Sequence, residues 1–157
     1  MARPDGRAGF NGRGFAKMMK GDFAGAAVDF KKSVDLNLSS PLAILWLHWC
    51  NARLGKDDHE ELAKFALAVD PKGWPGPAVR FALGQIPLEE MLAAAKDPSE
   101  LQTRYRESQA YYYAGEYFLS IHDTGNAEKM FREAISKNRR DGIFDAAARG
   151  ELAALNK

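Results

Sequence analysis

The hydrophobic pattern of the chain is clearest between Tyr111 and Ala134, in the stretch YYYAGEYFLSIHDTGNAEKMFREA. This order of aromatic and small residues predicts two antiparallel helices joined by a short turn. Gly115 and Ala127 are predicted to lie where the helices cross, because small side chains let two backbones approach closely. Phe118 and Phe131 are predicted to fill the volume beside that crossing. The pattern positions are Tyr111, Ala114, Gly115, Phe118, Ala127, Phe131 and Ala134.

The same pattern occurs near the N-terminus, in residues 7–40. It predicts helices over residues 8–20 and 23–36, joined by the turn GDFAGA. Arg13 replaces the usual apolar residue and Ser33 the usual final alanine. Both replacements suit an end repeat whose outer side meets solvent. The matching positions are Phe10, Gly14, Gly21, Asp22, Phe23, Ala26 and Phe30.

A second predicted repeat spans residues 41–74 and opens with a strongly apolar helix, LAILWLHWCNARLG. Ser39 and Ser40 precede Pro41, which is typical of N-capping chemistry followed by a proline in the first helical turn. The helix is expected to end at Gly55. This glycine lies one repeat length after the glycine in the turn of the first repeat.

The pattern weakens after this apolar helix. A helix is predicted over about residues 58–69, but Glu60 replaces the small residue expected at the crossing, so we expect this helix to be rotated or shifted. Residues 75–107 occupy the place of a third repeat, which we call the degenerate slot because the repeat pattern is lost there. Glycine and proline residues divide it into two short predicted helices, 77–83 and 87–95.

The fourth repeat covers residues 108–141. Ser99 with Gln102 resembles a capping box that starts the long helix leading into this repeat. Apolar residues then recur at helical spacing in residues 142–155, which predicts a terminal helix that covers the exposed end of the repeats. The apolar positions of this capping helix are Phe144, Ala147, Leu152 and Leu155.

These spacings resemble tetratricopeptide repeats. The resemblance implies an all-α fold, a right-handed α-solenoid of eight or nine antiparallel helices with a C-terminal capping helix. A chain of 157 residues with 46% hydrophobic content is within the size of one domain. We therefore predict a single domain over residues 1–157.

Charge and hydropathy exclude several functions. The formal charge is +1, with 22 basic against 21 acidic residues, which argues against a dedicated nucleic-acid binder. No run of eighteen apolar residues is present, so we expect no membrane insertion. The N-terminus has neither an apolar h-region nor a cleavage site, so we expect no secretory signal. This predicts the cytoplasm as the sequence stands, or the periplasm and envelope if the natural N-terminus differs.

The sequence offers little for catalysis or for a cofactor. Cys50 is the single cysteine and is predicted to be buried and inert in the apolar helix. His48, His59 and His122 are far apart in the sequence. The charges of residues 57–61 are contiguous and point around a helix, so they predict a solvated N-terminal turn. We therefore expect no catalytic residues, no metal, no cofactor and no enzyme activity.

A more specific resemblance rests on the order of several segments. An apolar helix containing LWLHW is followed by Trp74 and Pro75, then Phe81, Leu83 and Gly84, then LEEML, and finally YYYAGEYFLSIHDTGNAEKMF. This order resembles the C-terminal part of bacterial NlpI-type tetratricopeptide proteins over residues 7–155. The resemblance implies an envelope-associated adaptor that dimerises and brings peptidoglycan hydrolases and proteases together. It carries over no catalytic residue, and from the sequence as it stands we expect no lipoprotein signal or lipidated cysteine.

In this architecture the first helix of each repeat lines a concave surface. Protein-binding surfaces favour aromatic residues, methionine and arginine, which bury much area at modest entropic cost. We therefore hypothesise a non-catalytic adaptor that binds a protein or peptide, and a homodimer. The alternatives are that these side chains pack neighbouring repeats, or that the chain is an oligomerisation module without a peptide ligand. The predicted partner-binding residues are Asn11, Phe15, Trp49, Arg53, Tyr112 and Glu116.

Overall fold

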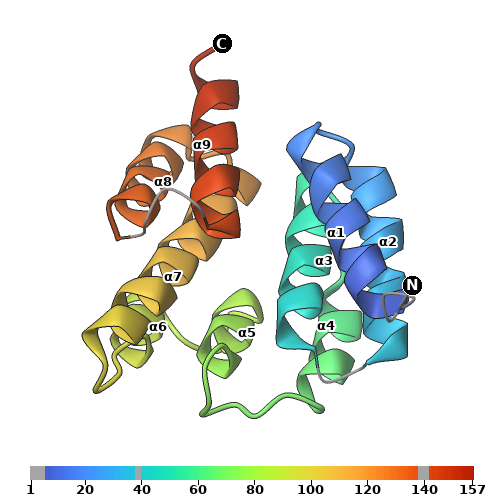
Figure 1. Ribbon diagram of the computed structural model, residues 1–157, viewed down its shortest axis with the longest axis horizontal. Helices are drawn as coiled ribbons and strands as arrows, with labels where there is room; N and C mark the ends of the chain where they lie inside the picture. The colour runs from blue at the N-terminus through green and yellow to red at the C-terminus, as the bar shows by residue number, and fades with distance from the viewer. Residues whose placement is uncertain (1–5, 38–39, 138–141) are drawn as a thin grey trace, which may run out of the picture. The chain divides into compact units, whose positions relative to one another are not determined.

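The computed structural model describes residues 6–37, 40–137 and 142–157 of the chain. All regular secondary structure in these residues is α-helical, and it forms nine helices (Figure 1). The predicted all-α class is therefore confirmed for the described part. The chain divides into two compact units, Met1–Leu83 and Gly84–Lys157, and each is described by itself. The solenoid and the single domain stay predictions.

Unit 1 contains five helices. Helix α1 packs on α2, α2 on α3, and α3 on both α4 and α5. Their bounds are α1 Gly6–Met19, α2 Phe23–Leu36, α3 Pro41–Arg53, α4 His59–Ala66 and α5 Gly76–Ala82. Pro41 occupies the first helical turn of α3, as predicted. Ser40 is the N-cap residue of α3, but its side chain accepts no capping hydrogen bond, so the predicted capping by Ser40 is wrong. Ser39 lies outside the described residues.

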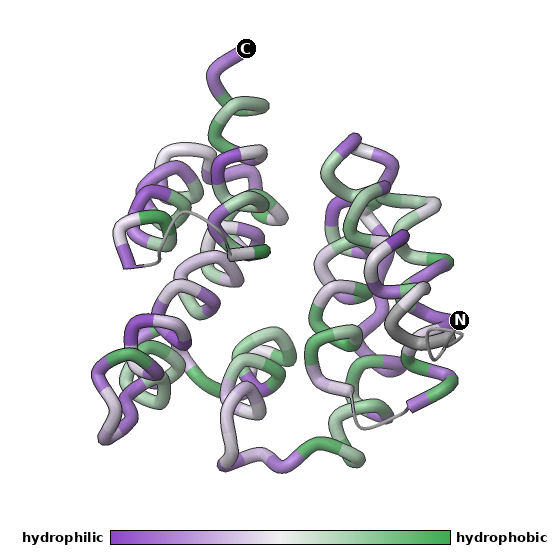
Figure 2. The backbone as a smooth tube through the Cα atoms, viewed as in Figure 1, coloured by the Kyte–Doolittle hydropathy of each residue, from purple (hydrophilic) through white to green (hydrophobic). Residues whose placement is uncertain are grey.

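The core of unit 1 forms around α3. Most residues of this helix are buried, and its first part is largely green in Figure 2, so α3 is enclosed on most sides. The rings of Phe30 and Trp46 stack with centroids 6.2 Å apart, and Phe15 meets Trp46 edge-on at 5.9 Å. These contacts join α1, α2 and α3. Cys50 is fully buried in the same helix, as predicted.

Helix α4 and the following segment depart from the repeat. One repeat length after Phe23, the first residue of α2, would place the start of α4 at position 57, but α4 begins at His59 and ends at Ala66. The shift expected from Glu60 is therefore confirmed. The degenerate slot 75–107 contributes one helix to each unit, because α5 packs on α3 and α4 whereas α6 packs on α7.

Unit 2 contains α6 to α9. Their bounds are α6 Leu88–Ala94, α7 Glu100–Ser120, α8 Thr124–Lys137 and α9 Ile143–Leu155. The Ser99 hydroxyl accepts a long hydrogen bond of 3.4 Å from the Gln102 backbone N–H, which confirms the predicted start of α7. Helix α9 packs on both α8 and α7, as expected of a capping helix.

Aromatic side chains fill the core of unit 2. Tyr112 lies 5.7 Å from both Phe131 and Phe144, measured between ring centroids, and Tyr113 meets Phe144 edge-on at the same distance. Both tyrosines are fully buried. Burial raises the pKa of the Tyr113 hydroxyl far above its usual range, so this group stays protonated. No helix among the described residues has the length and apolar character needed to cross a membrane.

Candidate functional site

The α1–α2 and α7–α8 hairpins share a close helix crossing. A Cβ atom added to Gly14 would lie 3.0 Å from Phe30 Cε1, and one added to Gly115 would lie 2.7 Å from Phe131 Cδ1. Both distances are shorter than ordinary van der Waals contact, so each crossing requires glycine or a shift of its phenylalanine. Ala127 is fully buried. The crossing predicted at Gly115 is therefore confirmed.

The two hairpins also share a turn. Gly21 has φ +80°, and the following Asp22 accepts a hydrogen bond of 2.9 Å from the Gly25 backbone N–H. In the second hairpin His122 has φ +62°, and Asp123 accepts one of 3.1 Å from the Asn126 N–H. Each aspartate thus satisfies an N–H group that a helix N-terminus leaves free. The hydrogen bond from the Asn126 backbone lowers the pKa of Asp123.

Three of the predicted partner-binding residues in unit 1 are partly accessible. Asn11, Phe15 and Arg53 are half-buried. The Phe15–Trp46 contact places α1 beside α3, so the first helices of the two predicted repeats are neighbours. The Arg53 guanidinium lies 4.4 Å from the centroid of the Phe23 ring, in a cation–π contact.

The other three predicted residues are enclosed. Trp49 is 3% exposed, Tyr112 is fully buried and Glu116 is 2% exposed. Tyr112 donates a hydrogen bond of 2.9 Å to a carboxylate oxygen of Glu116. Phe144 of α9 packs against Tyr112, which explains its burial. These three side chains therefore offer no surface to a ligand in this structure, and a packing role fits them better than the anchor role expected from the sequence.

Two polar atoms of the predicted set are buried without a hydrogen-bond partner among the residues that the structure describes. They are the Asn11 amide oxygen Oδ1 and the Trp49 indole nitrogen Nε1. Buried polar groups in native structures are nearly always paired, so unpaired ones point to an unfilled interaction. Of these two residues, Asn11 is half-buried and Trp49 is enclosed, so only the Asn11 side chain is partly accessible.

The sequence reasoning missed a polar cluster that joins α3 to α4. His48 Nδ1 lies 2.8 Å from Asp58 Oδ1, and the Asn51 amide donates a 3.0 Å hydrogen bond to Asp58 Oδ2. The side chain of Asp58 is only 12% exposed, so the solvated turn predicted for residues 57–61 is wrong at this position. The available signal was the spacing of His48 and Asn51, one turn apart on one face of α3.

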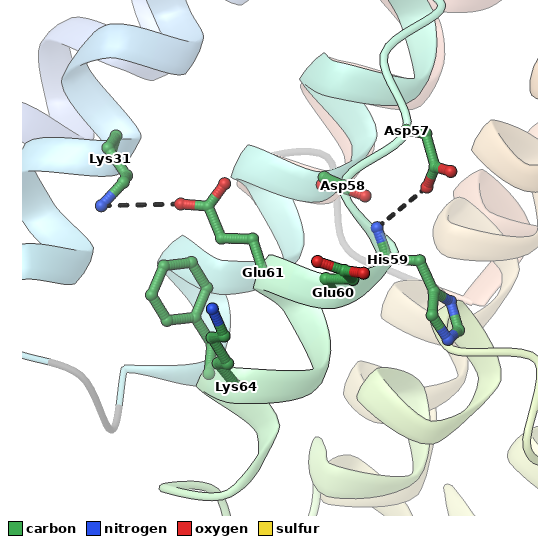
Figure 3. Close-up of a pocket in the computed structure, with 8 residues that line it drawn as sticks. Lys31, Asp57, Asp58, His59, Glu60, Glu61 and Lys64 are labelled. Carbon is green, nitrogen blue, oxygen red and sulfur yellow. Dashed lines mark hydrogen bonds and ion pairs between the residues drawn. The ribbon is translucent and has the colours of Figure 1, made fainter.

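The remaining charges of this region line an open pocket of about 780 Å³ between α2 and α4. Figure 3 shows Lys31 facing Glu61 across it, with the His59 ring turned away. Lys31 Nζ lies 2.6 Å from Asp35 and 3.5 Å from Glu61, and the hydrogen bond to Asp35 raises the lysine pKa. The pocket lining carries four carboxylates against two lysines, so its net charge is negative. Across the described ranges, no three His, Cys, Asp or Glu side chains converge as metal ligands would.

No known protein-family model matches this chain. The candidate site therefore rests on this structure alone, and we use the name α1–α3 face for three half-buried side chains, Asn11 and Phe15 on α1 and Arg53 on α3. Its side chains are an amide, an aromatic ring and a guanidinium. This chemistry suits hydrogen bonding and apolar contact with a polypeptide.

Proposed function

We propose that this protein is a non-catalytic scaffold that binds a segment of another protein on its α1–α3 face. The main support is the recurrence of one helical hairpin, with a glycine packed against a phenylalanine ring and an aspartate-capped turn, at both α1–α2 and α7–α8. Stacked hairpins of this kind form α-solenoids whose surfaces bind protein segments. The proposal includes this tetratricopeptide-like solenoid and its kinship with NlpI-type adaptors.

The α1–α3 face supplies the chemistry that such binding requires. Phe15 offers an apolar ring that is only partly used by Trp46, and rigid rings bury area at small entropic cost. Asn11 contributes a half-buried amide, a group that can both donate and accept hydrogen bonds. Arg53 presents a planar guanidinium suited to a carboxylate, which favours an acidic ligand segment.

The test compares the wild type with the triple variant Asn11→Ala, Phe15→Ala, Arg53→Ala. Tagged proteins are used to capture partners from envelope and cytosolic extracts, and the affinity of each purified partner is then measured by calorimetry. We expect the triple variant to lose a partner that the wild type binds. Arg53→Ala alone should weaken an acidic partner by about 2 kcal/mol, roughly 30-fold in Kd.

The matched control is Val28→Ala with Arg104→Ala, which removes one exposed apolar side chain from α2 and one exposed arginine from α7. Circular dichroism of both variants checks that the fold is retained. Identical partner sets for the wild type and the triple variant would exclude the α1–α3 face, and turnover of a recovered small molecule would overturn the non-catalytic assignment.

A second candidate is an oligomerisation module without a peptide ligand. On α7, Leu101 is 69% exposed and Tyr105, one turn later, is 46% exposed. Exposed apolar side chains on one helix face favour association with a second copy. Light scattering at micromolar concentration tests this candidate directly. A mass of 17.4 kDa, that of one chain, would count against a dimer, whereas loss of a dimer in Leu101→Lys would support this candidate.

A further inference from the structure

A second cleft lies in unit 2, between α8 and α9, and has a volume of about 460 Å³. Its described lining combines two guanidinium groups, one hydroxyl and two aliphatic side chains. Unlike the charged pocket of unit 1, none of these lining residues carries a carboxylate. They are Arg132, Ile135, Ser136, Arg149 and Leu152.

Both arginines are held in place by neighbours on their own helices. Arg132 donates from Nε and Nη2 to Glu128, at 3.1 and 2.7 Å. Arg149 donates from Nε to Asp145 at 3.0 Å, and the Asp145 side chain is only 3% exposed. A guanidinium carries five N–H donors, so only three of the ten donors in the cleft have a partner among the described residues. The carboxylates thus orient the guanidinium groups without exhausting their donors.

The apolar part of the cleft is small. Ile135 and Leu152 are both half-buried, and Ser136 uses its hydroxyl hydrogen on the Glu133 carbonyl oxygen at 2.7 Å. Two aliphatic side chains provide contact for one apolar side chain of a ligand, whereas a long acyl chain would leave most of its length in water. The volume lies in the range of small-ligand sites.

From these features we propose that the α8–α9 cleft binds the C-terminal carboxylate of a peptide whose last residue is apolar. The free donors of Arg132 and Arg149 hold the carboxylate by charge-assisted hydrogen bonds, which are shorter and stronger than neutral ones. Ile135 and Leu152 contact the terminal side chain. This site is separate from the α1–α3 face in its residues and does not depend on the function proposed for that face.

The test uses the fluorescein-labelled peptide Gly-Ser-Gly-Ser-Ala-Leu in two forms, with a free C-terminal carboxylate and with a C-terminal amide. Fluorescence anisotropy with the wild-type chain should show saturable binding of the acid and at least tenfold weaker binding of the amide. Added salt should weaken binding of the acid, because an exposed charge pair is screened. This comparison needs no variant and therefore no assumption about folding.

The variant Arg132→Ala, Arg149→Ala should lose at least tenfold in affinity for the acid. The control Arg104→Ala, Lys129→Ala removes the same number of positive charges from exposed positions and should bind as the wild type does. The triple variant of the α1–α3 face should also keep full affinity, so failure of one proposal is distinguishable from failure of the other.

Three results would overturn the proposal. They are equal affinity for the acid and the amide, no binding of the acid at millimolar concentration, and an equal loss in the control variant. Dodecanoate is tested in parallel. Binding of dodecanoate without binding of the peptide acid would assign the cleft to a fatty acid instead.

Discussion

The α1–α2 and α7–α8 hairpins place the same structural features at equivalent positions but differ in the side chains that pack around them. The offset that aligns Gly14 with Gly115 also aligns Gly21 with His122 and Phe30 with Phe131. At these positions both hairpins have the close crossing, the turn residue with positive φ and the buried ring. The comparison shows which features a helical hairpin of this type needs, because these features persist while the surrounding residues change.

The clearest difference concerns the positions beside the crossing. In the first hairpin Asp29 is fully buried and accepts hydrogen bonds from Arg13 at 2.9 and 2.7 Å, and Lys17 lies 2.9 Å from it. The aligned residues in the second hairpin are Met130, Ala114 and Phe118, all apolar. The same backbone thus accommodates either a charged cluster or apolar packing. Predictions at three places, namely the crossing, the charged cluster and the turns, test this comparison, and the expected effect decreases in that order.

The largest effect is expected at the crossing of the second hairpin. Gly115→Leu should destabilise the protein by about 3 kcal/mol or more, because the added side chain would overlap the buried Phe131 ring and force the two helices apart. Urea unfolding followed by circular dichroism measures this change. Near-neutral stability would mean that α7 and α8 do not cross at Gly115.

The variants Gly14→Ala and Gly115→Ala compare how tightly the two helix crossings are packed. Alanine gains about 1 kcal/mol of helix propensity over glycine at either site. At Gly14 the added carbon needs only a small shift of Phe30, so the net change should lie within about 1 kcal/mol. At Gly115 the overlap is deeper, so we expect a loss of about 1 to 3 kcal/mol. Equal changes at both sites would contradict the difference in packing.

The helices follow from local sequence patterns, whereas the accessibility of the candidate site does not. The predicted α1 and α2 match the observed Gly6–Met19 and Phe23–Leu36 closely, because glycine, aspartate and aromatic spacing are local signals. The burial of Tyr112 depends on Phe144, which is distant in sequence. Residue type alone cannot separate an aromatic anchor from an aromatic core residue.

The charged cluster of Arg13, Lys17 and Asp29 also depends on contacts that local sequence patterns do not predict. Arg13 departs from the repeat pattern, and the sequence suggested only that it meets solvent. The structure shows that it pairs with Asp29 on the neighbouring helix. A pairing between residues sixteen apart depends on how two helices face each other, which single-sequence periodicity does not determine.

The second prediction concerns this cluster. The hydrogen bonds from Arg13 lower the pKa of Asp29 to about 2. A carboxyl group whose folded pKa is depressed stabilises the fold above its unfolded pKa, near 4, and this contribution is lost as the pH falls towards 2. Asp29→Asn should therefore cost about 1 to 2 kcal/mol at pH 7.

The measurement is the difference in free energy of unfolding between the wild type and Asp29→Asn at several pH values. This difference should be constant from pH 7 to about pH 5 and should shrink between about pH 4 and pH 2. The matched control is Asp35→Asn, which removes an exposed carboxylate from the same helix. A difference that stays constant down to pH 2 would exclude a depressed pKa for Asp29.

The smallest effect is expected at the turns, where Gly21 and His122 both adopt positive φ. This region costs a residue with a Cβ atom about 1 kcal/mol relative to glycine. His122→Gly should therefore stabilise the protein by about 0.5 to 1 kcal/mol, and Gly21→Ala should destabilise it by about 1 kcal/mol. Thermal and urea unfolding of the two variants measure these changes. Changes in stability of opposite sign would show that the two turns have the same backbone and differ only in how well the residue at positive φ suits it. A loss of stability in both variants would instead mean that the His122 side chain stabilises its turn.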